Sequence, residues 1–272
     1  MANIDLLDLD FSDNDTFELS NGELTTSHNL KIGEKFKFAK NLKNNDFLNR
    51  ESVSIDESLK FQIEYYVYQL FENNEKLTFK YFAKESLCIH KPLTLVLGLP
   101  RPRMLRKILE LAAVLPIKAI HLVVSDLSDK SFLLSHATND DEICQQIRTG
   151  VKQSGFPFFP QIKFVKESRQ FFDEVFPSLA GYHVLGDSMP EFLNSSAANL
   201  LVGENKEIND NGIVVFIGPE RGWSKRERTL IVNQGAKLVS LGAEIYQVDT
   251  AVVAICSQLK MVYDMNLEKD NS

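Results

Sequence analysis

Cysteine is scarce in this chain of 272 residues. Cys88, Cys144 and Cys256 are odd in number and widely spaced, which excludes a disulfide framework and a zinc-binding cysteine pattern. The five histidines are scattered without metal-ligand spacing, so we expect no bound metal. Few, unpaired thiols are typical of a reducing compartment, and we therefore expect a cytoplasmic protein.

Long apolar stretches are absent too. No window approaches the roughly 18 uninterrupted apolar residues that a membrane helix requires, so we expect no membrane partner. The N-terminus lacks the basic region and apolar run of a secretory signal, and the chain shows no internal repeat. A hydrophobic content of 44% with 25% charged residues is ordinary for a soluble globular protein, and the length allows one large core or two modest ones.

Positive charge is missing from residues 1–30, which contain seven acidic residues and no Lys or Arg. These acids account for the whole net charge of −7, so residues 31–272 carry no net charge. An acidic protein is not a typical nucleic-acid binder, but local basic clusters can still present a positive face. We interpret the acidic segment as a solvated or partly ordered arm; shielding of a nucleic-acid-binding face is the alternative.

The first third of the chain contains short runs rich in aromatic and β-branched residues, which are typical of strands. We predict strands over residues 35–38, 61–68 and 76–82, with a hairpin turn at Asn73-Asn74 between the last two. The polar residues 41–58 are expected to form an extended loop. Residues 1–90 are therefore expected to fold as a small β domain.

From Pro92 onward, apolar runs alternate with segments of helical spacing. Residues 93–99 are nearly continuously apolar, as strands buried on both faces are. Strands that alternate with helices predict an α/β domain with a parallel sheet over residues 91–272. The predicted strands are residues 93–99, 119–124, 161–165, 183–185, 212–217 and 237–241, and the predicted helices are residues 103–115, 139–152, 168–178, 224–234 and 248–265.

Glycine turns follow three of these strands, at the sheet edge where ligands bind in parallel α/β folds. The first is Ile-Gly-Pro-Glu-Arg-Gly-Trp at residues 217–223, followed by a capping-box pattern from Ser224 to Glu227. The second is Leu-Gly-Ala-Glu-Ile-Tyr at residues 241–246, and the third is residues 185–187. Glycine permits positive φ and close approach of the backbone to a ligand. Each turn alone could equally be a plain strand-to-helix connection, but together they predict a ligand site.

The segment Phe216-Ile217-Gly218-Pro219-Glu220-Arg221-Gly222-Trp223-Ser224 resembles the Ile-Gly-Pro-Glu-Gly-Gly-Phe-Ser loop of the RsmE family. These are SPOUT-superfamily enzymes that methylate N3 of a uridine in small-subunit ribosomal RNA. Residues 239–251 resemble the family's Leu-Gly-Pro-Arg-Ile-Leu-Arg-Thr-Glu-Thr-Ala stretch. The likeness is strong over residues 212–258, moderate over residues 93–211 and faint before them, where residues 31–34 are similar to part of the family's PUA-like β-barrel.

The resemblance implies a trefoil knot at the C-terminus of the α/β domain, a PUA-like β-barrel in residues 1–90 that binds RNA, and a homodimer. It also implies S-adenosylmethionine as cofactor and ribosomal RNA or the small ribosomal subunit as partner. Backbone groups in glycine turns can read the edge of an adenine, and apolar side chains can cover its faces. Carried over by position, the cofactor-binding residues are Leu185, Gly186, Ile217, Gly218, Pro219, Gly222, Leu241, Gly242, Ile245, Tyr246, Thr250 and Ala251.

The chain departs from the family at several positions. The family's Gly-Gly is Arg221-Gly222 here, which places a bulky cation in the loop. Gln247 and Phe156 stand where the family has arginines, which we expect to hold RNA phosphate or the target base. Arg221 could replace one of them by reaching from the opposite loop. We interpret Trp223 as a packing anchor for the loop, with base stacking as the alternative.

Catalysis by such a site needs few special groups, because methyl transfer from a sulfonium is an in-line displacement that positioning promotes. The imide nitrogen of a uridine must also lose its proton, so an acceptor or an oxygen-stabilising cation would help. Glu220 and Asp249 are the candidate acceptors, and Arg221 is the candidate cation. The alternative is that both carboxylates only stabilise the neighbouring helix N-termini.

Basic residues gather after two predicted strands. A charge run is usually an ordinary solvated face, but both clusters fall on the predicted ligand side, so we take RNA-phosphate contacts as a hypothesis. One cluster, the candidate RNA-binding set, comprises Arg101, Arg103, Arg106 and Lys107, and the other comprises Arg221, Lys225, Arg226 and Arg228.

Three functional hypotheses remain open from the sequence. The first is an active RNA methyltransferase, the second a non-enzymatic RNA- or ribosome-binding protein that retains the fold, and the third a methyltransferase with a different substrate. A phosphate-binding P-loop is excluded, because no Gly-Lys-Ser/Thr follows the glycine loop.

Overall fold

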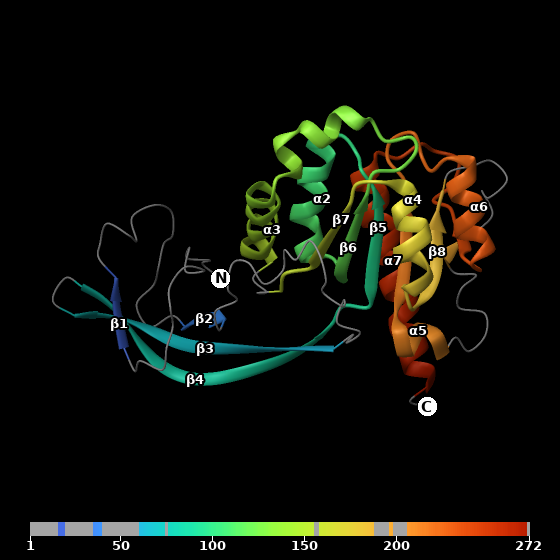
Figure 1. The fold of residues 1–272 in the computed structure, drawn as a ribbon. Coiled ribbons are helices and arrows are strands. Elements are labelled where there is room, and N and C mark those ends of the chain that lie inside the picture. The colour runs from blue at the N-terminus through green and yellow to red at the C-terminus, as the bar shows by residue number, and fades with distance from the viewer. Residues whose placement is uncertain are drawn as a thin grey trace.

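The computed structural model describes residues 16–19, 35–39, 60–73, 76–154, 158–187, 196–197 and 206–270. These residues form an antiparallel sheet from the N-terminal third and a parallel sheet, covered by helices, from the remainder (Figure 1). In the described part of the chain, no helix is both long and apolar enough to cross a lipid bilayer.

The N-terminal sheet has four antiparallel strands in the order β1-β4-β3-β2. The three predicted strands are confirmed as β2, β3 and β4, and the last two form the expected hairpin, in which Asn73 pairs with Lys76. Both hairpin strands are longer than predicted, because their pairing continues as far as Lys60 and His90. Asn74 and the predicted loop 41–58 lie outside the described residues, and the PUA-like barrel stays a prediction. The bounds are Thr16–Leu19 for β1, Lys35–Ala39 for β2, Lys60–Asn73 for β3 and Lys76–His90 for β4.

The second sheet confirms the predicted α/β class. Its six strands are all parallel and lie in the order β10-β8-β9-β5-β6-β7. Each corresponds to a predicted strand. The bounds are Leu93–Gly98 for β5, Ile117–Val123 for β6, Gln161–Val165 for β7, Tyr182–Gly186 for β8, Ile213–Ile217 for β9 and Lys237–Val239 for β10. The last strand is shorter than predicted, because the Ser240 hydroxyl accepts a hydrogen bond from the Gly242 N–H and turns the chain.

Helices cover both faces of this sheet, as the apolar strands require. On one face, Leu93, Leu95 and Leu97 of β5 pack in a core shared with α2, α3, α5 and α7. On the other face, Val96 packs with the segment after α4 and with α6 (Figure 1). The bounds are Pro102–Val114 for α2, Asp140–Ser154 for α3, Ser168–Gln170 for α4, Lys206–Asn211 for α5, Lys225–Asn233 for α6 and Val248–Asp270 for α7.

The helix predicted over residues 168–178 is not uniform. After α4 the chain continues as a π-helical turn, Phe171–Val175, and a 3-10 turn, Phe176–Ser178. Wider π turns bring side chains five residues apart onto one face. Phe171 and Phe176 are therefore both buried and stack with ring centroids 6.1 Å apart. Packing of the aromatic rings against the sheet overrides regular α-helical geometry here.

His121 of β6 makes the stability of this domain dependent on acid. Its side chain is 1% exposed, and neither ring nitrogen has a hydrogen-bond partner among the described residues. Burial, with a smaller contribution from Lys163, lowers the His121 pKa from 6.5 to about 3. Below pH 6.5, His121 is therefore protonated in the unfolded chain but stays neutral in the folded protein. The free energy of unfolding consequently decreases as the pH falls from 6.5 toward 3. At pH 5 the loss from this residue is about 2 kcal/mol.

A His121→Leu variant should lose this pH dependence. We expect its free energy of unfolding, from urea titrations at pH 7.5 and pH 5, to fall less between the two conditions than that of the parent. The exposed His136, replaced by Gln, is the control and should leave the difference unchanged. An equally large acid loss in the Leu variant would show that other groups cause it.

Candidate functional site

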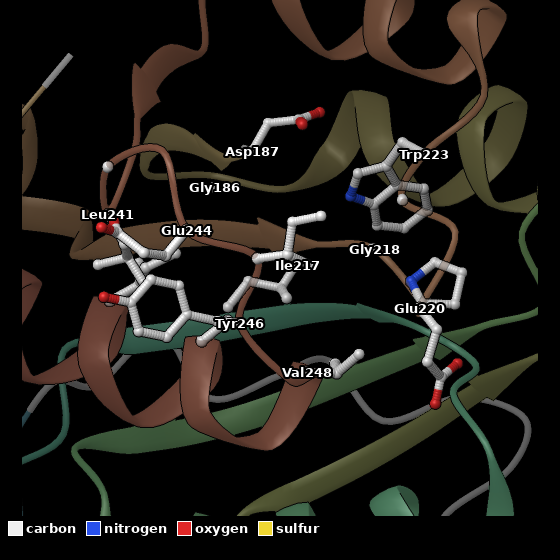
Figure 2. Close-up of a pocket in the computed structure, with 16 residues that line it drawn as sticks. Gly186, Asp187, Ile217, Gly218, Glu220, Trp223, Leu241, Glu244, Tyr246 and Val248 are labelled. Atoms are coloured by element: carbon white, nitrogen blue, oxygen red, sulfur yellow. The ribbon is translucent and has the colours of Figure 1, made fainter. Parts of the chain in front are cut away.

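A pocket opens at the carboxyl ends of β8, β9 and β10, where ligands bind in parallel α/β sheets. Its empty volume is about 680 Å³, part of which is open to solvent. Figure 2 shows the side chains and turns that surround it. The lining residues are Gly186, Asp187, Ile217, Gly218, Pro219, Glu220, Gly222, Trp223, Leu241, Gly242, Glu244, Ile245, Tyr246, Val248, Ala251 and Ile255.

The glycine loop after β9 forms one wall. A Cβ atom on Gly218 would lie 2.7 Å from the carbonyl carbon of Gly222 and 2.8 Å from the nitrogen of Trp223, so no larger residue fits. Gly222 has a φ of +69°, and its N–H donates to the Pro219 carbonyl at 2.7 Å. The end of β5 packs directly against the loop, because Gly98 lies so close to the Pro219 ring that a Cβ atom on it would clash. The turn is therefore fixed by backbone contacts.

The turn after β10 and the first part of α7 form the opposite wall. Gly242 has a φ of +115°. Val248, Ala251 and Ile255 then follow at helical spacing and line the pocket with one face of α7. Asp249 is only 1% exposed and forms an ion pair with Lys107 of α2, which holds the start of the helix in place. Burial would raise the Asp249 pKa, but the hydrogen bonds from Lys107 and the Thr250 N–H outweigh it and lower the pKa below its usual value.

The helix after the glycine loop begins as the sequence predicts. Ser224 caps α6, and the reciprocal bonds of a capping box with Glu227 are both present. Glu227 is completely buried and also accepts hydrogen bonds from the Asp126 N–H at 2.9 Å and the Ser168 hydroxyl at 2.6 Å. A single carboxylate thus joins the glycine loop to the turns that follow β6 and β7. Hydrogen bonds from Arg226 and Ser224 lower the pKa of Asp126 in the same network.

The structure brings ten of the twelve predicted cofactor residues to this pocket. The exceptions are Leu185, which is fully buried in the core between the sheet and its helices, and Thr250, which is exposed at the start of α7. Glu220 also lines the pocket, and its carboxylate accepts a hydrogen bond from the Arg101 N–H at 3.0 Å. Arg221 is exposed and is not among the lining residues, so its side chain does not fill the pocket. Asp249 lies outside the lining as well.

Sequence reasoning missed several lining residues. Val248 and Ile255 could have been found from helical spacing, since they lie three residues before and four residues after Ala251. Asp187 is the last residue of the third glycine turn, and Glu244 lies within the second. Trp223 is 1% exposed and packs edge-on against Phe172 at 6.3 Å, which confirms the predicted packing role and leaves no open face for a base. The ring also borders the pocket, which the sequence did not indicate.

Residues 89–260 match the RNA methyltransferase domain family, over more than half of the chain. The chain belongs to this family. It is 32% identical over 171 residues to the ribosomal RNA small subunit methyltransferase E of Treponema pallidum, a match that covers 62% of each chain. It is 24% identical over 187 residues to the ribosomal RNA small subunit methyltransferase E 1 of Borreliella burgdorferi, covering 68% of this chain and 74% of the relative. The chain thus matches less than two thirds of the length of its Treponema relative.

The fold is shared with solved structures of this family. The ribosomal RNA small subunit methyltransferase E of Neisseria gonorrhoeae, solved bound to S-adenosyl methionine, superimposes with a TM-score of 0.54 at 16% identity. The match covers 86% of this chain and 94% of that one. This agreement confirms the shared fold, and the family match together with the two named relatives confirms the RsmE resemblance found in the sequence.

Within this family domain, the predicted RNA-binding cations are not equally free. Arg106 donates to Glu142 at 2.5 Å, and Lys107 is held by Asp249. Arg101 is exposed and lies only at the 3.9 Å margin of an ion pair with Glu220. Arg103 is exposed and forms no ion pair with any other residue that the structure describes. Arg101 and Arg103 are therefore the two cations of this set that can bind an RNA phosphate without breaking a close ion pair.

Proposed function

We propose that this protein is an S-adenosylmethionine-dependent methyltransferase that acts on N3 of a uridine in small-subunit ribosomal RNA. The observation that carries the proposal is the pocket of three glycine turns at the strand ends, within the RNA methyltransferase domain. When bound, S-adenosylmethionine supplies a methyl group on a positively charged sulfur. The relatives' names supply the RNA class, and the resemblance of residues 216–224 supplies the target atom.

The residues present fit this cofactor. Because Gly218 has no side chain, a ligand can approach the backbone of its turn closely. Ile217, Leu241 and Ile255 offer apolar surface for a flat base. The Trp223 N–H and one oxygen of Asp187 are buried at the pocket without a hydrogen-bond partner among the described residues, as expected of groups that await a polar ligand. The cofactor-binding set proposed from the sequence thus gains Asp187, Trp223, Val248 and Ile255.

Glu220 is the proposed proton acceptor, because it alone of the two predicted carboxylates lines the pocket. The Arg101 N–H holds it at the rim, on the side where Arg101 and Arg103 are exposed. Arg221 is proposed to stabilise negative charge on the target base or on a phosphate. Asp249 is proposed to act indirectly, by fixing the start of α7 through Lys107.

The remaining features are proposed from the family resemblance. They are a trefoil knot, a PUA-like RNA-binding barrel, a cytoplasmic location and a homodimer. For the homodimer, the exposed Met261 and Met265 on α7 and the exposed Ile245 and Tyr246 beside the pocket provide apolar surface that a second copy would cover. The non-enzymatic alternative would be favoured by a blocked pocket, and Arg221 does not block it.

Calorimetric titration with S-adenosylmethionine tests the cofactor assignment. We expect the parent protein to bind it with a single class of site, and a Gly222→Val variant, whose φ of +69° a β-branched residue cannot adopt without strain, to bind much more weakly. A folded parent that shows no heat of binding would instead favour the non-enzymatic hypothesis.

The RNA surface is tested by an Arg101→Ala/Arg103→Ala variant. We expect its affinity for small-subunit ribosomal RNA to fall about 10-fold or more at moderate salt, and the slope of log affinity against log salt to become shallower by about 2, since two phosphate contacts are lost. Cofactor affinity should stay unchanged, because only the backbone of Arg101 contacts Glu220 closely. Lys237→Ala, at the opposite end of the sheet, is the control. An unchanged salt slope in the double variant would place the RNA elsewhere.

A further inference from the structure

Two polar atoms on one side of the pocket have no hydrogen-bond partner in the described part of the chain. The indole N–H of Trp223 is buried in a side chain that is 1% exposed, and it meets no acceptor among the described residues. The Asp187 side chain is 10% exposed, and its Oδ2 atom accepts no hydrogen bond from any residue that the structure describes. Both residues line the pocket, and Figure 2 shows them along one side of it, with Tyr246 and Val248 along the other. Buried polar atoms without partners are costly, so each points to a ligand group that completes it.

The charge of this corner limits what the ligand group can be. Arg228 lies with its Nη1 atom 3.5 Å from Asp187 Oδ2, close enough to offset the charge of the carboxylate but without forming a hydrogen bond. Among the described residues, this corner therefore offers one donor and one acceptor without a hydrogen-bond partner, and its carboxylate is already paired with a cation. A cationic group would meet Asp187 already paired with a guanidinium, whereas a neutral hydroxyl can donate to the carboxylate, and a hydroxyl oxygen can accept from the indole.

We propose that Asp187 and Trp223 bind the ribose hydroxyls of the cofactor. The inference rests on the proposed function, since it assumes an adenosine-containing cofactor in this pocket. Ribose places two hydroxyls side by side, which suits one acceptor and one donor that border the same space. Trp223 stands at the Phe position of the family's loop, and phenylalanine has no N–H. The phenylalanine of the family's loop could not donate this hydrogen bond, whereas the indole of this chain can.

The experiment compares S-adenosylhomocysteine with its 2′-deoxy and 3′-deoxy analogues by titration calorimetry. For the parent, we expect loss of at least one of the two hydroxyls to weaken binding about 10-fold or more, because the buried partner is left unpaired. In Asp187→Ala, S-adenosylhomocysteine should bind about 10-fold more weakly, and that discrimination should largely disappear. Trp223→Phe keeps the packing and removes only the donor, so we expect a smaller loss of both affinity and discrimination.

A second ligand separates the ribose from the amino-acid end of the cofactor. The probe is 5′-methylthioadenosine, which retains the ribose and lacks the charged amino-acid group. We expect Asp187→Ala to weaken its binding by the same factor as that of S-adenosylhomocysteine. An effect on S-adenosylhomocysteine alone would assign Asp187 to the ammonium group and overturn the inference.

Glu244→Ala is the matched control, because Glu244 is an acidic residue that lines the same pocket but is exposed. It should change the affinities for the ribose and deoxyribose ligands by the same factor. Discrimination that persists in Asp187→Ala, in a variant whose thermal unfolding matches the parent, would also overturn the inference. If the parent binds S-adenosylhomocysteine and both deoxy analogues equally well, the inference is contradicted but the proposed function is not. If a folded parent binds none of the ligands, the proposed function itself is contradicted.

Discussion

We expect Gly218→Ala to bind S-adenosylmethionine about 100-fold more weakly than the parent. The added methyl group would lie within 2.8 Å of three backbone atoms of Gly222 and Trp223, and backbone atoms cannot move aside without reshaping the turn. Overpacking of this kind costs roughly 3 kcal/mol at its upper range, which corresponds to about 100-fold in affinity when the strained loop is the binding surface.

Gly222→Ala is the informative comparison for this prediction. Its Cβ would meet nothing within 4 Å, so the substitution adds only the cost of a positive φ, roughly 1–2 kcal/mol. We therefore expect the affinity to rank parent, Gly222→Ala and Gly218→Ala in descending order by titration calorimetry. A Gly218→Ala variant that is folded and binds as tightly as the parent would contradict the assignment of this loop to the cofactor.

Glu227→Ala is expected to lower the free energy of unfolding by roughly 3–5 kcal/mol. The carboxylate has no exposed surface and accepts three hydrogen bonds, from the Ser224 N–H at 2.8 Å, the Asp126 N–H and the Ser168 hydroxyl. Truncation leaves all three donors unpaired and opens a cavity. The measurement is urea-induced unfolding followed by fluorescence of Trp223, which is the single tryptophan of the chain.

Glu227→Gln separates shape from charge at the same position. The amide fills the same space and retains one acceptor oxygen, but its NH₂ group faces a donor, so we expect about half the loss seen for Ala. If the Ala variant loses less than about 1 kcal/mol, the network does not hold the glycine loop, and the loop must be fixed by its own turn.

The sequence predicted best what depends on neighbours in the chain. The strand at residues 93–98 is nearly continuously apolar because both of its faces are covered, and the capping box at Ser224 needs only residues three apart. The glycine turns were predictable because the glycines that expose the backbone to a ligand can be read directly from the sequence. The three glycine turns therefore indicated the position of the pocket from the sequence alone.

Contacts between distant segments could not be predicted in the same way. The pair between Lys107 and Asp249 joins residues 142 positions apart, and on this ground we propose that both residues support the start of α7. The π turn at Phe171–Val175 depends on how three phenylalanine rings fill one face of the sheet. The role proposed for Asp187 depends on Trp223, which lines the same pocket, and on Arg228, which pairs with its carboxylate. Both residues come from a later part of the chain.

The most direct test of the central claim is methyl transfer to RNA. Small ribosomal subunits assembled from unmodified transcript would be incubated with the protein and S-adenosylmethionine carrying an isotopically labelled methyl group, and the RNA nucleosides analysed by mass spectrometry. We expect label in 3-methyluridine with the parent and little or none with Gly218→Ala. A parent that binds both the cofactor and the RNA yet leaves the nucleosides unlabelled, or labels a different base, would contradict the proposed reaction.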